Sequence, residues 1–112
     1  MTRRAEAWLW IAQRASAAVM AVFVAVHLAT MIYAVRGGLS AGEILGRTQG
    51  RLGWLLFYGL FVLAAAVHTP IGLRVVAREW LGWRGRSADL AAALAGGGLL
   101  AGGLRAVWSM YA

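Results

Sequence analysis

The fold class follows from one uninterrupted apolar segment, residues 52–73, which reads L-G-W-L-L-F-Y-G-L-F-V-L-A-A-A-V-H-T-P-I-G-L. About 20 apolar residues in a helix cross the hydrocarbon core of a bilayer, which is about 30 Å thick. Similar segments lie on either side, at about 15–35 and 90–111. Their apolar residues are continuous rather than alternating, which excludes a β-barrel. We predict an all-α membrane protein, a single domain over residues 1–112 with three transmembrane helices at about 9–35, 52–79 and 88–111.

The composition agrees with a membrane protein. Of the 112 residues, 62% are hydrophobic and 13% are charged, whereas soluble domains are about 45–50% apolar. The chain has no cysteine, which excludes disulfides, thiolate metal sites and iron–sulfur ligation and leaves histidine as the candidate metal ligand. The net charge of +7 comes from arginines at the ends of the apolar segments, as is typical of membrane anchors. Nucleic acid is therefore not an expected partner. The basic N-terminus precedes an apolar run without a convincing cleavage site, so we expect a retained first span.

The two connections carry local signals. Ser40 and Glu43 have the spacing of a capping box, which predicts a short surface helix over about 41–47. In the second connection, Ser87 or Asp89 is expected to cap the third helix. The third helix contains a small-xxx-small pair at Gly98 and Gly102, which we interpret as a packing contact within the chain rather than a dedicated dimer face.

The distribution of arginines predicts the orientation. Seven arginines lie at one end of the three spans and four at the other, and the richer end is expected inside. The first group is Arg3, Arg4, Arg14, Arg74, Arg78, Arg84 and Arg86, and the second is Arg36, Arg47, Arg51 and Arg105. We therefore expect the N-terminus inside and the C-terminus outside.

His68 is the strongest candidate for a cofactor ligand. A neutral imidazole is a good ligand for haem iron, and an ionisable side chain at membrane depth seldom lacks a function or a partner. Gly72 lies one turn later on the same face, where it would leave room for a flat macrocycle. Arg74 lies about 9 Å along the axis from His68, a suitable depth for a haem propionate. Pro70 could also kink the helix. The alternative is a histidine bonded to a neighbouring helix.

His27, the other histidine, also lies within an apolar segment and is a second candidate haem ligand, again with a structural bond to another helix as the alternative. Measured from the inner boundary, His27 is about 20 Å deep and His68 about 9 Å deep. A difference of about 10 Å makes it difficult for one chain to hold one haem with both, so each histidine is expected to pair with another chain at its own level. Arg14 and Ser16 could line the mouth of a quinone pocket or lie beside a propionate, although Arg14 could equally be an ordinary interfacial anchor.

The spacing of these residues resembles that of the membrane-anchor cytochrome b subunits of succinate:quinone oxidoreductases, which include fumarate reductases. The second-helix pattern is carried by His68, Gly72 and Arg74, and the first-helix pattern by Arg14 and Ser16. In the family a histidine often precedes the first-helix arginine, whereas this chain has Gln13. The presence of His27 as well as His68 resembles the members that carry two haems.

The resemblance implies a haem-b-binding anchor subunit that passes electrons between an iron–sulfur subunit and membrane quinone. Its partners would be a flavoprotein, the iron–sulfur subunit and a second anchor chain, either an identical copy or a different subunit. Two haems b are expected per pair of anchors, in the bacterial inner (cytoplasmic) membrane. The chain has no flavin or nucleotide motif, so it would be a non-catalytic subunit. The alternatives are a b-type cytochrome anchor of another dehydrogenase, a small multi-span transporter and a structural membrane protein.

Overall fold

The computed structural model describes residues 2–112, which form four helices and no strand. Three are long: α1 (Arg3–Arg36), α3 (Leu52–Trp80) and α4 (Arg86–Tyr111), and the short helix α2 (Ala41–Thr48) joins α1 to α3. Each long helix is long and apolar enough to cross a membrane. The all-helical fold and the three candidate spans therefore agree with the prediction from sequence.

Local hydrogen bonds fix the N-terminal ends of α1 and α2. The Thr2 side chain accepts a hydrogen bond from the backbone of Ala5 and caps α1, which therefore begins earlier than the expected residue 9. Ser40 and Glu43 form the predicted capping box at the start of α2. A short polar side chain at this position satisfies backbone N–H groups that have no partner within the helix.

The start of α4 differs from the prediction. Its N-cap is Gly85, with φ of 92°, and neither Ser87 nor Asp89 caps the helix. Ser87 accepts a hydrogen bond from the indole of Trp83, and Asp89 forms an ion pair with Arg74 on α3. Both side chains are used to hold the connection and the neighbouring helix, so the chain turns through glycine instead.

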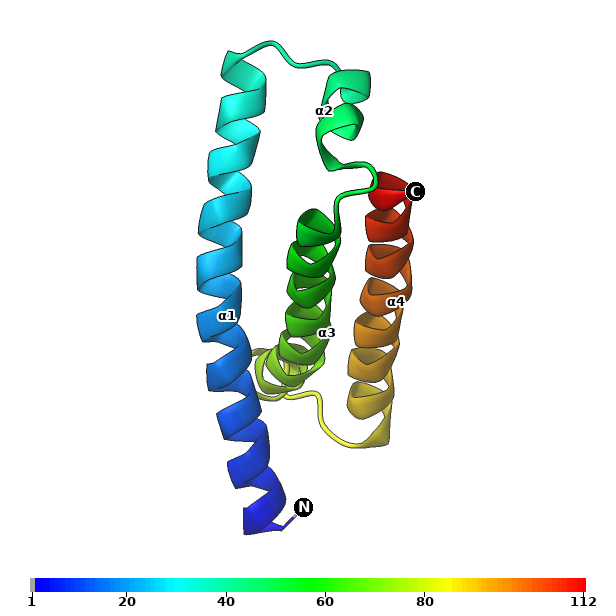
Figure 1. The fold of residues 1–112 in the computed structure, drawn as a ribbon. Coiled ribbons are helices and arrows are strands. Elements are labelled where there is room, and N and C mark those ends of the chain that lie inside the picture. The colour runs from blue at the N-terminus through cyan, green and yellow to red at the C-terminus, as the bar shows by residue number, and fades with distance from the viewer. Residues whose placement is uncertain (1) are drawn as a thin grey trace.

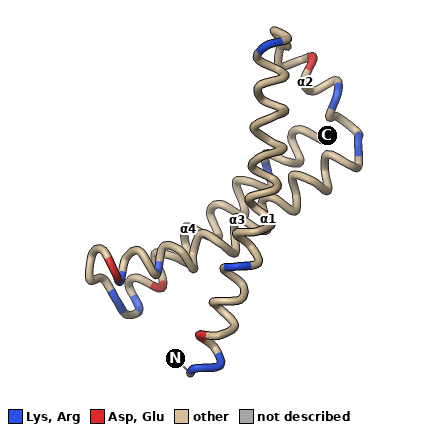
Figure 2. The backbone as a smooth tube through the Cα atoms, turned by 90° about the vertical axis from the view of Figure 1, so that its left-hand side faces the viewer, with Lys and Arg blue, Asp and Glu red and all other residues tan. Residues whose placement is uncertain are grey.

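The three long helices form an open row with α3 in the middle (Figure 1). α3 packs against α1 on one side and α4 on the other, whereas α1 and α4 have at most marginal contact. Seen from the side, α1 crosses the α3–α4 pair obliquely (Figure 2). No large hydrophobic side chain among residues 2–112 is fully buried. The long helices thus leave wide apolar faces for lipid or for other helices.

The α3–α4 seam is built on small residues. Pro70, inside α3, packs against Gly96, where an added Cβ would lie 3.0 Å from the proline ring. Val62 packs against Gly103 in the same way, at 2.7 Å. The prediction that Gly98 and Gly102 pack within the chain is wrong, because an added Cβ at either position would meet nothing within 4 Å. These two glycines lie on the opposite side of α4.

The C-terminal end of α4 is tied to the segment after α2, next to it in Figure 1. The backbone N–H of Gly50 donates to the carbonyl of Tyr111 at 2.8 Å, and the Gln49 side chain donates to Ala112. The three long helices alternate in direction along the chain, so the N-terminus lies at the opposite end of the bundle from this cluster.

Candidate functional site

The candidate site lies in the seam between α1 and α3. His68 is partly buried on the same face of α3 as two residues that mark the seam, since positions four or seven apart on a helix share a face. These are Phe61, which stacks on Phe23 of α1, and Gly72, which meets Gln13 of α1. His68 is therefore placed toward the first helix.

The His68 ring has an unusual environment. Its Nδ1 is buried and has no hydrogen-bond partner among the described residues. The side-chain oxygen of Gln13, in the same seam, is also buried without a partner. Each such atom costs about 1–3 kcal/mol in a dry environment, so two in one seam call for a functional explanation. The expected alternative, a hydrogen bond from His68 to a neighbouring helix, is not formed within residues 2–112.

Gly72 is a point of close approach between the two helices. A Cβ added there would lie 3.3 Å from the side-chain nitrogen of Gln13. The space opened by this glycine is thus filled by the end of a flexible amide side chain from α1. A flat ligand over Gly72 would need the Gln13 side chain to rotate away.

His27 lies on α1 at the other end of the same seam. Its Nδ1 is 3.1 Å from the hydroxyl of Tyr58 on α3, and its ring meets Tyr58 and Phe61 edge to face, with centroids at 5.5 Å and 5.9 Å. Its backbone carbonyl accepts a hydrogen bond from Thr30 at 2.7 Å. The structural bond considered for His27 therefore exists, but it uses only one of the two ring nitrogens.

The two histidines lie at different levels of the bundle. His27 meets Tyr58, and Gln13 meets Gly72, so the antiparallel register is the same at both ends of the seam. His68 is ten residues beyond Tyr58 on α3, which is about 15 Å along the axis. This separation exceeds the 10 Å or so expected from sequence, so binding of one iron atom by both rings would be more difficult still.

The other candidate residues, near the N-terminal end of α1, are only partly brought together. Arg74 pairs with Asp89 at 2.8 Å and lines a pocket of about 460 Å³ between α1 and α3. Arg14 is exposed and lies over the ring of Trp10, 5.1 Å from its centroid. Ser16 is buried and donates to the carbonyl of Gln13 at 3.1 Å. Neither Arg14 nor Ser16 lines this pocket, whereas Gln13 and Trp10 do.

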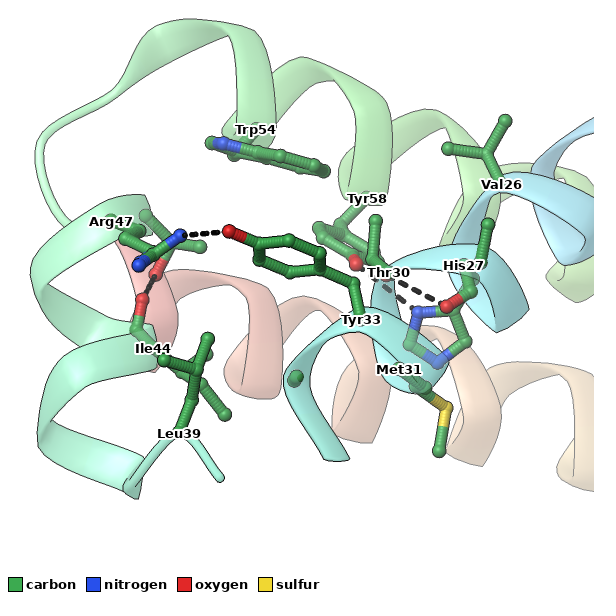
Figure 3. A pocket seen from close by; sticks show the side chains of 13 residues that line it. Val26, His27, Thr30, Met31, Tyr33, Leu39, Ile44, Arg47, Trp54 and Tyr58 are labelled. Atoms are coloured by element: carbon green, nitrogen blue, oxygen red, sulfur yellow. Dashed lines mark hydrogen bonds between the residues drawn. The ribbon is translucent and has the colours of Figure 1, made fainter. Parts of the chain in front are cut away.

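A second pocket, of about 500 Å³, lies at the α2 end of the same seam (Figure 3). His27 and Tyr58 are on its wall, and Arg47 donates a hydrogen bond across it to the hydroxyl of Tyr33 at 3.2 Å. No group of three or more acidic, cysteine or histidine side chains that could hold a metal ion occurs in residues 2–112. A haem needs only one or two histidines.

A comparison with known protein families identifies the family of the chain. The model that describes the succinate dehydrogenase/fumarate reductase transmembrane subunit matches residues 1–104, almost the whole chain. The chain belongs to this family. No curated protein and no solved structure matches the chain. Members of the family are membrane subunits of succinate dehydrogenase or fumarate reductase complexes, and the three apolar helices suit a multi-pass membrane subunit.

Two residues of this transmembrane subunit were not identified as site residues from the sequence. Tyr58 lies within the apolar segment of the second span and has no expected role of its own, but it is the partner of His27. Gln13 is expected only as a departure from the family pattern, but it fills the space over Gly72. Arg36 and Arg51 are the two ends of the first connection. His27 lies nine residues before Arg36, so in an antiparallel pair of helices it is expected opposite residue 60, nine residues after Arg51. This position is within two residues of Tyr58, so the count could have predicted the pair.

Proposed function

We propose that this chain is a haem-b-binding membrane anchor that passes electrons between an iron–sulfur subunit and membrane quinone. The flavoprotein and the iron–sulfur subunit would dock at the inner face. The complex would lie in the bacterial cytoplasmic membrane with the N-terminus of this chain inside. The dicarboxylate chemistry would belong to the flavoprotein, so this chain has no catalytic residue of its own.

The observation that carries the proposal is the environment of His68. An imidazole with a buried, unpaired nitrogen lies in an apolar helix seam, in a chain of a family whose members are redox-complex subunits. A neutral histidine in a dry site is a suitable axial ligand for haem iron. Haem, when bound, would supply one-electron transfer within the hydrocarbon core of the membrane.

The second ligand of each haem would come from another chain. The sequence has only two histidines, and they lie about 15 Å apart along the seam. The open row of helices leaves the α1–α3 face free for the helices of a second anchor. A symmetric partner would place His68 opposite His68 and His27 opposite His27, which gives two haems at two levels. A different subunit with its own two histidines would give the same result.

The inner-end residues would have supporting roles. Arg74 would hold a propionate, since only its Nε is bonded to Asp89 and the rest of its guanidinium is available for a second anion. Arg14 and Ser16 would lie beside a propionate or the quinone. The inner pocket next to Arg74, with its mixture of charged and aromatic lining residues, would admit a quinone head group.

The family assignment favours this proposal over a small transporter, which would want a carboxylate within a span. Glu79 and Asp89 lie at the ends of helices, and Glu6 lies in the first turns of α1. An anchor of another dehydrogenase would share the haem ligands but not the partner subunits. Co-purification of a flavoprotein and an iron–sulfur protein with the chain would separate the two.

The experiment is a haem assay on the purified complex with His68→Ala and His27→Ala. A reduced-minus-oxidised spectrum of the unmodified complex should have low-spin b-type bands, and each variant should lose the haem at its own level. Thr69→Ala is the matched control, because it removes a polar side chain beside His68 without removing a ligand. Full haem content in His68→Ala would overturn the assignment.

A further inference from the structure

The pair formed by His27 and Tyr58 carries a further inference about the second haem level, and this inference rests on the function proposed above. Tyr58 belongs to α3 and His27 to α1, so the bond joins the two helices (Figure 3). The distance of 3.1 Å between Nδ1 and the hydroxyl oxygen is that of a normal hydrogen bond. His27 and Tyr58 are each only partly exposed.

The direction of this bond depends on the tautomer of the imidazole. If Nδ1 carries the proton, it donates to the Tyr58 oxygen, and Nε2 keeps a free lone pair. If the hydroxyl donates instead, Nε2 carries the proton and is no longer a ligand. In Figure 3 the second ring nitrogen lies on the side of the ring opposite Tyr58. No hydrogen bond among residues 2–112 uses this nitrogen.

Tyr58 is itself held in place. Its ring stacks on Trp54, with centroids 5.8 Å apart and planes at 20°, and it meets the His27 ring edge to face. Thr30 donates to the backbone carbonyl of His27 rather than to its ring, so it does not compete for the imidazole. His68 offers the contrast within the same chain, because its Nδ1 has no such partner.

We propose that Tyr58 is a positioning residue for His27: its hydroxyl oxygen accepts a hydrogen bond from Nδ1–H, which fixes the ring and leaves Nε2 free to bind the iron of the second haem. Partners of this kind raise the basicity of a ligating histidine. A more basic ligand stabilises the ferric form more than the ferrous form, so the bond lowers the midpoint potential of this haem. The haem at His68 lacks this contribution, and the two levels would thereby differ in potential.

The test is a redox titration of the whole complex with Tyr58→Phe, which removes only the hydroxyl and keeps the ring that stacks on Trp54. The haem that His27→Ala eliminates should titrate at a higher potential. A tenfold change in the preference for ferric over ferrous haem is about 59 mV for one electron. The haem at His68 should be unchanged, which also serves as the check on folding.

Tyr33→Phe is the matched control. It removes a hydroxyl from the same pocket, but that hydroxyl is bonded to Arg47 rather than to a histidine, so neither potential should move. If Tyr58→Phe disturbs both haems, site-specific 3-fluorotyrosine at position 58 replaces it. This weakens the oxygen as an acceptor while retaining the hydroxyl, and should give a smaller shift of the same sign.

The outcomes separate the two proposals. Unchanged potentials in Tyr58→Phe, with both haems retained, would overturn the role of Tyr58 and leave the haem function intact. An equal shift in Tyr33→Phe would also overturn it, because the effect would then be general to the pocket. Retention of both haems in His27→Ala would overturn the second haem level itself, and the role of Tyr58 with it.

Discussion

The contact between Gly103 and Val62 allows the α3–α4 packing to be tested quantitatively. In Gly103→Ala the added Cβ would lie 2.7 Å from Val62 Cγ1 and 2.9 Å from Cγ2, whereas ordinary contact begins at 3.4 Å. The approach is thus about 0.7 Å too close. Val62 cannot readily turn aside, because a β-branched side chain in a helix has one preferred rotamer. We expect the helices to separate slightly, and overpacking of this kind costs about 1–3 kcal/mol.

A matched substitution isolates that cost. Gly98→Ala is on the same helix, where an added Cβ meets nothing within 4 Å, so it reports the gain in helix propensity alone, up to about 1 kcal/mol. The difference between the two variants is the packing penalty. In unfolding by dodecyl sulfate in mixed micelles, followed by circular dichroism, Gly103→Ala should be less stable than Gly98→Ala by about 1–3 kcal/mol.

A double substitution identifies the cause. Val62→Ala removes both clashing methyl groups, so Gly103→Ala should cost much less in that background than in the unmodified chain, with a coupling above about 0.5 kcal/mol. Equal stability of Gly103→Ala and Gly98→Ala would refute the packing described for α3 and α4. So would an unchanged cost of Gly103→Ala in the Val62→Ala background.

Two further predictions concern the topology and the ion pair between Arg74 and Asp89. Single cysteines at Ser40 and Ser87 should report opposite sides of the membrane; an impermeant thiol reagent applied to intact cells should label Ser40→Cys only, and labelling of Ser87→Cys from outside would reverse the proposed orientation. Asp89→Asn should cost less than about 1 kcal/mol in the same unfolding assay, because its side chain is 56% exposed and exposed ion pairs are weak. Glu79→Gln, which removes a carboxylate with no ion pair among residues 2–112, is its control, and a loss of several kcal/mol in Asp89→Asn would contradict the exposed position of the pair.

The features predicted from sequence are those that local physics determines. The long apolar spans need only hydrophobicity and length, and the capping box at Ser40 and Glu43 needs only a spacing of three residues. The pattern of His68, Gly72 and Arg74 led to a prediction of the family, and the matching family model confirms that family. Haem ligation by these residues stays a prediction, as do the roles of Arg14, Ser16 and His27.

The features that sequence analysis missed depend on which side of a helix meets its neighbour. α4 has several glycines, and nothing in their spacing distinguishes Gly96 and Gly103, which pack on α3, from Gly98 and Gly102, which do not. Asp89 was a reasonable cap by position, but Arg74 approaches it from another helix and takes its carboxylate. The pairing of His27 with Tyr58 depends on the register between α1 and α3, which the connecting loop sets only approximately.

The central claim is that His27 and His68 act at separate levels, each with a partner from another chain. Its most direct test is the haem stoichiometry of the intact complex, measured with the ligands assigned in the unmodified protein and in the two histidine variants. The account predicts two haems b per pair of anchor chains, one lost in His68→Ala and the other in His27→Ala. A single haem held by His27 and His68 of the same chain would contradict the separation of about 15 Å, and with it the account.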